Sequence, residues 1–295
     1  MIEIKDVSKV YENGKKALNK INLEVNKKDI VGIIGRNGAG KTTLFKIICG
    51  LIDDYTGESK VFDKMSDITL TDEISYLPEM RGLDHRAYVI EHLTDLVRYK
   101  GLSKKEALQS VTKWLKEFSL YDYKYQKISS LSKGNQQKIQ LIASIASNPK
   151  ILILDEPFSG LDLITIDLFW KTILKLRDEG CTILFSTHDL NDNILKCNKL
   201  VFINQGEIKE SGTIEEIQKH FNMVLELKNK SCSIEYLQSI AGKENVQVVE
   251  GDEYYIKIKD EKMARVIFDG LQDKYSEKFF VRKIRVPEIF REICR

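Results

Sequence analysis

The sequence has almost no excess of charge and no long apolar run. Its 295 residues include 46 lysines and arginines against 44 aspartates and glutamates, which gives a formal net charge of +2. Nucleic-acid-binding proteins usually carry a strong basic excess, so we expect no nucleic-acid partner. The longest apolar stretches, such as Ile151–Leu154, fall far short of the ~18 residues that a membrane-spanning helix needs. Work at a membrane would therefore require a second chain that spans it.

The sequence also lacks paired cysteines, internal repeats and low-complexity segments. Its five cysteines are scattered, and none forms a CxxC pair. Scattered free cysteines that behave as small hydrophobic residues are typical of a cytosolic protein, so we predict that all of them are reduced. Residues 1–4 enter an alternating strand pattern directly, without the pattern of a signal peptide. These features favour a cytoplasmic protein.

The first two-thirds of the chain alternates short apolar runs with longer helical patterns, which is typical of an α/β protein with a largely parallel sheet. Buried strands are predicted at Ile30–Ile34, Ile151–Leu154 and residues 182–186. Between the first two strands, apolar residues recur at helical spacing on one face: Ala107, Val111, Trp114, Leu115 and Phe118. We therefore predict a helical subdomain, over about residues 80–150, that is inserted into the α/β core.

The pattern changes near residue 221. A turn at residues 204–206 and a capping box formed by Thr213 and Glu216 close the first part. The sequence then predicts a strand, a helix, two strands, a helix and a final strand, at residues 223–227, 233–241, 246–249, 254–259, 263–271 and 279–286. This is the ferredoxin-like order. We therefore expect two domains, residues 1–220 and a small α+β domain at residues 221–295.

Residues 35–42, GRNGAGKT, match the phosphate-binding loop GxxxxGK[ST]. Glycines let such a loop fold tightly, so that successive backbone amides point at the phosphates. The Lys41 ammonium would reach the β- and γ-phosphates, and the Thr42 hydroxyl would help to hold Mg²⁺. A buried strand precedes the loop and a helix-compatible run at residues 43–49 follows it, as the motif requires. The predicted ATP-binding residues here are Gly35, Asn37, Gly38, Ala39, Gly40, Lys41, Thr42 and Thr43.

Two carboxylates follow the buried strand Ile151–Leu154. Asp155 fits the Mg²⁺-binding role that phosphate-loop ATPases need. Glu156 fits a base that orients and polarises the attacking water. Acids at a strand end are a moderate signal alone, but together with the phosphate loop they predict ATP hydrolysis.

Residues 131–137 read LSKGNQQ. Here the sequence resembles the ABC ATPase family, whose signature reads LSGGQ, although Lys133 and Asn135 depart from that consensus. This version is similar to that in cassettes of bacterial drug, sodium and peptide exporters. In the family, the segment gives a serine hydroxyl and a glycine amide to ATP held by the opposite subunit, and Ser132 and Gly134 occupy those positions. The resemblance therefore implies that two subunits complete their ATP sites as a head-to-tail dimer.

Four further positions are matched to the family through the same resemblance. Residues 159–162, SGLD, look like its D-loop, which assigns Asp162 to the nucleotide site. His188 looks like its switch histidine at the γ-phosphate, and Tyr11 lies where the family has an aromatic ring that stacks on adenine. Glu79 departs from the pattern, because the family usually has a glutamine there that touches Mg²⁺ and the attacking water. A carboxylate still accepts from metal-bound water, but it adds negative charge beside the phosphates.

The resemblance covers about residues 1–220 and implies the ATP-hydrolysing subunit of an ABC transporter. It implies a phosphate-loop ATPase core, ATP and Mg²⁺ as cofactors, and a separate integral membrane permease that holds the chain at the inner face of the cell membrane. Export is favoured over import only through this resemblance. The dimer is either a homodimer or a pair with a second ATPase subunit. The C-terminal domain resembles, more weakly, an extension of some exporter ATPases.

Two other interpretations remain open. The first is a soluble ABC ATPase acting on ribosomes or DNA, but this chain has one phosphate loop rather than two, and no coiled-coil insertion. The second is an RNA-recognition fold in the C-terminal domain, where basic residues stand beside Phe279 and Phe280: Lys278, Arg282, Lys283 and Arg285. The aromatic-rich motif expected on such a sheet is absent.

Overall fold

The computed structural model describes residues 1–67, 72–79, 82–190, 192–271 and 276–294. The chain divides into two compact units, Met1–Ser211 and Gly212–Arg295, which we call unit 1 and unit 2. The structure divides the chain after Ser211, whereas the sequence predicted a domain boundary after residue 220. Helix α6 (Ile214–Gln218) belongs to unit 2, where the Gln218 side-chain amide donates a hydrogen bond to the Ile284 carbonyl at 2.7 Å.

The central sheet of unit 1 contains the three strands predicted from apolar runs. Among the described residues it has six strands in the order β10-β9-β3-β8-β7-β6. Their bounds are β3 Ile30–Ile34, β6 Ile74–Leu77, β7 Ile151–Leu154, β8 Thr182–Thr187, β9 Lys199–Asn204 and β10 Glu207–Gly212. The pairs β6–β7, β7–β8, β8–β3 and β3–β9 are all parallel. The carboxyl ends of these strands therefore meet at one edge of the sheet.

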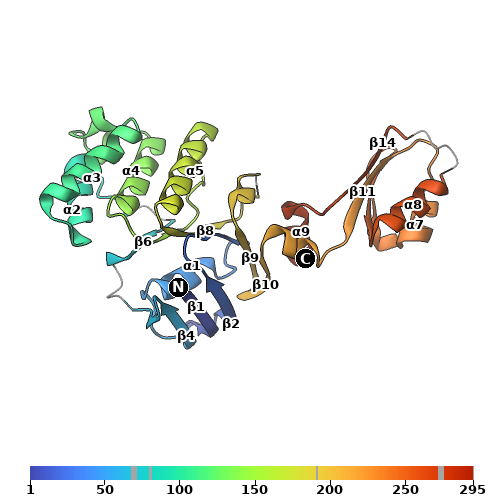
Figure 1. Cartoon of the computed structure of the whole chain (residues 1–295), viewed down its shortest axis with the longest axis horizontal. Helices are drawn as coiled ribbons and strands as arrows, with labels where there is room; N and C mark the ends of the chain where they lie inside the picture. Colours follow the sequence, from blue (N-terminus) through green and yellow to red (C-terminus); the bar gives the residue numbers. More distant parts are fainter. Residues whose placement is uncertain (68–71, 80–81, 191, 272–275, 295) are drawn as a thin grey trace. The chain divides into compact units, whose positions relative to one another are not determined.

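A second sheet and helix α1 cover one face of the central sheet (Figure 1). The second sheet has the strand order β2-β1-β4-β5. The bounds are β1 Ile2–Val10, β2 Lys16–Val25, β4 Thr56–Val61, β5 Lys64–Met65 and α1 Lys41–Ile48. Alternate residues of the central strands, such as Ile151 and Ile153 on β7, enter the apolar core between these layers. This alternation is the period of two that a strand imposes on its side chains.

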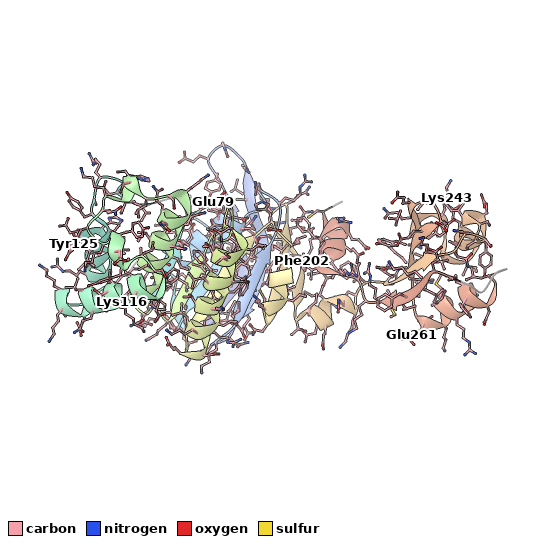
Figure 2. All side chains as sticks on the ribbon, turned by 90° about the horizontal axis from the view of Figure 1, so that it is seen from above. Glu79, Lys116, Tyr125, Phe202, Lys243 and Glu261 are labelled. Carbon is pink, nitrogen blue, oxygen red and sulfur yellow. The ribbon has the colours of Figure 1, made fainter. Side chains whose placement is uncertain are left out.

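Helices α4 and α5 pack against the other face of the central sheet, and α2 and α3 pack against α4 (Figure 1). Their bounds are α2 Val89–Tyr99, α3 Lys104–Glu117, α4 Lys133–Ile145 and α5 Leu163–Asp178. The predicted apolar face of the insertion is confirmed, because all of its members are buried in this core: Ala107, Val111, Trp114, Leu115 and Phe118. The polar face of the same segment carries Lys116 and the exposed Tyr125 (Figure 2). Residues 80 and 81, where the predicted subdomain begins, lie outside the described residues.

Unit 2 contains one antiparallel sheet with two helices packed on one face. The described strands follow the order β12-β13-β11-β14. The bounds are β11 Met223–Lys228, α7 Ile234–Ala241, β12 Val246–Glu250, β13 Glu253–Ile258, α8 Glu261–Asp269 and β14 Lys278–Arg282. Tyr254, Ile256 and Ile258 alternate along β13 and are buried with Leu225 and Leu227 of β11. This core holds the helices against the sheet.

The end of unit 2 corrects the sequence prediction. A strand was expected over residues 279–286, but β14 ends at Arg282 and helix α9 (Val286–Ile293) follows. Pro287 lies in the first turn of α9, where its missing N–H costs nothing and its fixed φ favours a helix. The Glu288 carboxylate accepts a hydrogen bond from the Arg285 amide at 2.7 Å and so caps the helix start. The strand was therefore predicted four residues too long, and the helix that follows it was not predicted.

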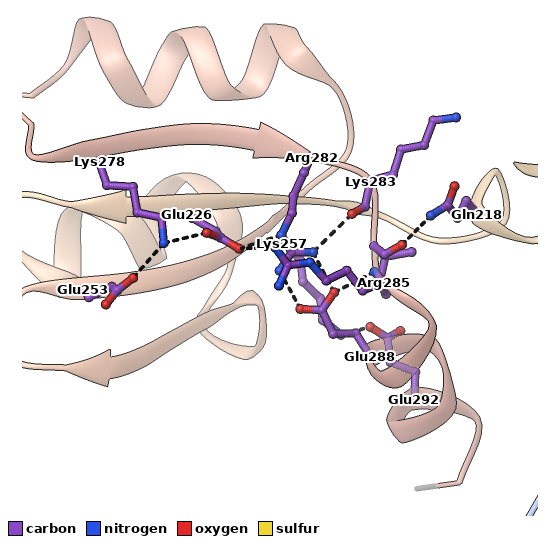
Figure 3. A network of polar contacts seen from close by, with 11 residues as sticks. Gln218, Glu226, Glu253, Lys257, Lys278, Arg282, Lys283, Arg285, Glu288 and Glu292 are labelled. Atoms are coloured by element: carbon purple, nitrogen blue, oxygen red, sulfur yellow. Dashed lines mark hydrogen bonds and ion pairs between the residues drawn. The ribbon is translucent and has the colours of Figure 1, made fainter. Parts of the chain in front are cut away.

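The other face of this sheet carries a charge cluster that consists of Glu226, Lys278, Arg282 and Glu288 (Figure 3). Glu226 lies between Leu225 and Leu227 on β11, so its side chain points away from the helices. Its carboxylate lies 2.6 Å from Arg282 and 2.7 Å from Lys278, while Arg282 also forms two 2.7 Å bonds with Glu288. These ion pairs connect α9 to the sheet.

Candidate functional site

The predicted site residues gather at the carboxyl edge of the central sheet. The phosphate loop follows β3, Glu79 follows β6, Asp155 and Glu156 follow β7, and His188 follows β8. Since these strands are parallel neighbours, their ends place the residues at one edge although they are far apart in the sequence. Ligands of open α/β sheets bind outside the carboxyl ends of the strands.

The phosphate loop requires glycine at two positions for steric reasons. A Cβ atom on Gly35 would lie 2.5 Å from the Ile203 carbonyl oxygen. Gly40 has φ +111°, and a Cβ there would lie 2.5 Å from the Ala17 carbonyl oxygen. The loop therefore lies tightly against the neighbouring strands, and α1 begins directly after it at Lys41. The first amides of a helix form a ready site for an anion.

Lys41 is almost completely buried, with 6% of its side chain exposed. Its ammonium donates to the Gly35 carbonyl at 2.7 Å and lies 3.2 Å from Glu156 Oε1. A buried ammonium needs such partners because removing the charge from water is costly. The loop therefore holds a cation at its centre.

Asp155 is also buried, with 2% of its surface exposed. Three hydroxyl groups approach its carboxylate. Thr42 Oγ1 donates to Oδ2 at 2.6 Å, Ser186 Oγ donates to Oδ1 at 2.5 Å, and the Tyr76 hydroxyl lies 3.3 Å from Oδ2. Burial and the nearby Asp155 charge raise the pKa of Tyr76, so this phenol stays a hydrogen-bond donor.

Glu156 is placed between two basic groups. Its Oε1 faces the Lys41 ammonium, and its Oε2 lies 2.9 Å from Nδ1 of His188. Among the described residues, Oε1 has no hydrogen-bond partner, although only 6% of the side chain is exposed. The backbone of Glu156 has φ +51°, in the left-handed region. Non-glycine residues rarely adopt this conformation, and at such sites it is often functional.

A cavity of about 280 Å³ opens at the phosphate loop. Its lining includes Lys15, Arg36 and Lys41, together with Asp155 and Glu156. Tyr11 lies at its wall and exchanges a 3.1 Å hydrogen bond with Thr43. Glu79, an exposed residue labelled in Figure 2, lines this cavity and a second one of about 240 Å³ beside α4. The structure therefore brings the loop, both acids, Tyr11 and Glu79 together.

The remaining predicted residues lie at helix starts within the same unit. Ser132 caps α4 by accepting from the Asn135 amide at 3.3 Å, and Asp162 caps α5 by accepting from the Thr165 amide at 2.8 Å. This bond holds the pKa of the Asp162 carboxyl below its usual range. Ser132, Gly134 and Asp162 are not among the described residues that line the phosphate-loop cavity. One chain alone does not bring them to its loop.

The donor atoms at the loop fit a magnesium ion. In the part of the chain that the structure describes, no group of three or more His, Cys, Asp or Glu residues is placed to hold a metal. Thr42 and Asp155 nevertheless present two oxygen atoms 2.6 Å apart at the phosphate loop. Mg²⁺ prefers oxygen ligands and commonly takes one or two from protein and the rest from phosphates and water. The two residues therefore fit that ion.

Two hydroxyl groups at this edge of the central sheet were not predicted as site residues. Ser186 and Tyr76 both contact Asp155, but they lie on strands β8 and β6, on opposite sides of β7. The only sequence signal was the position of Ser186, two residues before His188 at the end of an apolar strand. Such a signal does not predict a contact, because the register between the strands decides it.

Comparisons with known proteins identify the relatives of this chain. A family model described as ABC transporter matches residues 18–159. The Bacillus subtilis protein YhaQ, an uncharacterized ABC transporter ATP-binding protein, is 34% identical over 297 residues, which cover 99% of this chain and 98% of YhaQ. The Escherichia coli lipopolysaccharide export system ATP-binding protein LptB is 30% identical over 221 residues, 72% of this chain and 90% of LptB.

Solved structures match unit 1 in fold. The ATP-binding subunit of an ABC transporter superposes with a TM-score of 0.69 at 30% identity, covering 75% of this chain and 92% of that chain. A dimeric ATP-binding cassette bound to ADP and Pi superposes with a TM-score of 0.66 at 26% identity, covering 72% and 99% of the two chains. No helix among the described residues has the length and apolar character needed to cross a membrane. Identity to YhaQ over nearly the full length of both proteins shows that this chain belongs to the family of ABC transporter ATP-binding proteins, whose cassettes bind and hydrolyse ATP.

Proposed function

We propose that this chain powers the export of a small molecule, ion or peptide through a separate membrane permease. The proposal that the chain hydrolyses ATP at this site rests on the position of Glu156. Its carboxylate lies between the Lys41 ammonium at 3.2 Å and the His188 ring at 2.9 Å, beside the phosphate loop. This is where a base and two γ-phosphate contacts belong in a phosphate-loop ATPase.

The roles of the loop residues follow from their chemistry. Lys41 binds the β- and γ-phosphates, and the loop amides from Gly35 to Thr43 bind the phosphate oxygens. Glu156 accepts the proton of the attacking water, and His188 holds Glu156 and contacts the γ-phosphate. Tyr11 stacks on adenine at the wall of the cavity.

Thr42 and Asp155 are the residues that would hold Mg²⁺, with Glu79 as a further carboxylate at the mouth of the cavity. The ion supplies neutralisation of charge at the β- and γ-phosphate oxygens. The protein's part is orientation. Hydrogen bonds from Ser186 and Tyr76 fix the Asp155 carboxylate against Thr42 before any ligand arrives.

We propose that two chains, or this chain and a second ATPase subunit, form a head-to-tail dimer around ATP. Ser132 and Gly134 lie at the start of α4, where helix amides favour an anion. In one chain they stay outside the phosphate-loop cavity, so a second subunit is needed to bring such residues to it. The dimeric cassette with ADP and Pi supports this arrangement. Asp162 joins the nucleotide site through the same interface.

A mixing experiment tests the shared site. Lys41→Ala removes the ammonium that faces the phosphates, and Ser132→Arg blocks the donor from the second subunit. Each variant alone should be inactive. In a mixed dimer one site receives both defects and the other receives neither, so hydrolysis should reappear. Hydrolysis at the parent rate by Ser132→Arg alone would contradict the shared site, and the same result for Lys41→Ala would contradict the phosphate-loop assignment.

The partner and direction of transport are proposals as well. The name of LptB, an ATP-binding protein of an export system, supports export. The permease would hold this chain at the inner face of the cell membrane. Purification of the native complex in detergent, with mass spectrometry of the partners, should identify an integral membrane protein. Co-purification with ribosomes or nucleic acid instead would contradict the proposal.

We infer that unit 2 is a ferredoxin-like domain with a role in assembly or regulation. Its element order and its sheet order β12-β13-β11-β14 support the first part. All candidate ATP-site residues lie before Gly212, which supports the second part.

A further inference from the structure

We propose that Ser186 is a positioning residue that sets the geometry of both site carboxylates. This inference rests on the proposed roles of Asp155 and Glu156. Ser186 is the penultimate residue of β8, next to β7, which ends at the two acids. Its exposed surface is 0%, so its hydroxyl group makes all its contacts inside the protein.

The Ser186 hydroxyl is bonded to both acids at once. It accepts a hydrogen bond from the Glu156 backbone N–H at 2.9 Å and donates one to Asp155 Oδ1 at 2.5 Å. A hydroxyl carries one proton and two lone pairs, so a single serine can serve both partners. Alanine or valine at this position would remove both bonds together.

The bond to the Glu156 N–H matters because of the backbone conformation there. With φ +51°, Glu156 is in a region that the Cβ atom makes unfavourable. This turn sends the two adjacent acids in different directions, Asp155 toward Thr42 and Glu156 toward Lys41. A buried acceptor for the amide of the strained residue stabilises that turn. Ser186 therefore directs the Glu156 carboxylate without touching it.

The bond to Asp155 fixes which carboxylate oxygen faces the phosphate loop. Ser186 occupies Oδ1, so Oδ2 is the oxygen that accepts from Thr42 at 2.6 Å. Thr42 and this oxygen are the pair proposed for Mg²⁺. Loss of the Ser186 bond would let the carboxylate rotate about its terminal torsion and lose this pairing.

The experiment compares Ser186→Ala with Ser144→Ala in the full-length protein. Ser144 is a matched control, because it is also buried and its hydroxyl donates to the Leu141 carbonyl at 2.8 Å within α4. Three quantities are measured: ATP turnover, nucleotide affinity without metal, and Mn²⁺ affinity with a non-hydrolysable ATP analogue by electron paramagnetic resonance. Mn²⁺ serves as the probe for the Mg²⁺ position.

We expect Ser186→Ala to lower turnover and Mn²⁺ affinity by about 10- to 100-fold, the usual loss when an outer partner of a metal ligand is removed. Metal-free nucleotide affinity should not change, and Ser144→Ala should change none of the three. In the Glu156→Gln background, Ser186→Ala should cost less turnover than in the parent, because only its effect through Asp155 remains. Ser186→Cys, which is nearly isosteric and a weaker hydrogen-bond donor, should show an intermediate loss and covers the case in which alanine prevents folding.

Parent turnover and parent Mn²⁺ affinity in Ser186→Ala would overturn the proposal, as would an equal loss in Ser144→Ala. Failure of the proposed function has a different signature. If Glu156→Gln retained parent turnover, the base role of Glu156 would be wrong. The Mn²⁺ measurement would then still decide whether Ser186 orients Asp155.

Discussion

Both units bury carboxylates beside cationic side chains, but the two sets differ in how completely they are paired. In unit 2, Glu226 is 4% exposed and bonded to Arg282 and Lys278, and Arg282 makes two further bonds to Glu288 (Figure 3). In unit 1, Glu156 Oε1 faces Lys41 at 3.2 Å without a hydrogen-bond partner among the described residues, and its backbone is left-handed. One cluster is satisfied by its own chain, and the other is not.

The difference in pairing indicates different roles for the two clusters. Buried polar groups are normally hydrogen-bonded, and an exception in a native protein requires a reason. For the unit 2 cluster the reason is structural, since its ion pairs attach α9 to one face of the sheet. The incompletely paired, strained group in unit 1 lies at the phosphate loop, where we propose that the attacking water is the missing hydrogen-bond donor.

The largest effect is expected from Glu156→Gln. The amide keeps the shape of the side chain but cannot accept the proton of water, so hydrolysis should slow by about 10²–10⁴ while nucleotide affinity is retained. Steady-state phosphate release and equilibrium binding of ATP measure the two parts. Unchanged turnover would remove the proposed base, and Glu79 and His188 would be the next residues to test.

Arg282→Met should destabilise unit 2 by about 3–5 kcal/mol, because it leaves buried carboxylates without their main partner. Arg285→Met is the matched control. Arg285 is 63% exposed and lies 3.9 Å from Glu226, so its loss should cost about 0–1 kcal/mol. Hydrogen exchange of the β11 and β13 amides measures the loss of stability in both variants. ATP hydrolysis should not change in either variant. Equal effects of the two substitutions would show that the cluster is not structural.

Acid should weaken unit 2 through the same cluster. Burial alone would raise the pKa of Glu226 and of Glu288. Hydrogen bonds from Lys278 and Arg282 to Glu226, and from Arg282 and the Arg285 amide to Glu288, outweigh burial and hold both pKa values below the usual 4.5. A carboxyl group whose pKa is lower in the folded than in the unfolded protein stabilises the folded state. This stabilisation is fully present above pH 4.5 and is lost as the pH falls through the folded-state pKa. Urea unfolding of unit 2 should therefore need less denaturant below pH 4.5. The pH dependence of unfolding should be weaker in Arg282→Met than in the parent. An equal pH dependence in the two proteins would show that the charge cluster does not cause it.

Tyr11→Ala should weaken ATP binding by about fivefold, since stacking on a base is worth about 1 kcal/mol. Tyr11→Phe separates the ring from the hydroxyl that bonds Thr43. It should bind ATP like the parent. A loss of equal size in both variants would mean that the hydroxyl, rather than the ring, matters for the nucleotide.

The smallest effect is expected from a stop after Ser211, which removes unit 2. ATP affinity should not change, because every residue proposed for the ATP site lies in unit 1. Dimer stability, coupling to the permease, or both should change. A truncated protein that is still folded, as judged by circular dichroism, but fails to bind nucleotide would contradict the division of roles.

Much of the fold of unit 1 was predictable because its signals are local. The strands Ile30–Ile34 and Ile151–Leu154 are continuous apolar runs, and the insertion carries a helical apolar face. The second sheet of unit 1 was not assembled from the sequence, since β1 pairs with β4, and Ile2 on β1 lies opposite Val61 on β4. Helix α9 was not predicted, and the strand before it was extended four residues too far, because Pro287 and Glu288 act as helix-start signals only where the strand has already ended.

Residue types at short spacing were enough to predict the chemistry of the site: a glycine-rich loop with Lys41 and Thr42, and two acids after an apolar strand. These signals survive in sequence because each depends on residue types at fixed, short spacing. The contacts of Ser186 and Tyr76 with Asp155, and of His188 with Glu156, are visible only in the folded chain. Those contacts join neighbouring strands, and their geometry depends on strand order and register, which the packing of the whole sheet sets.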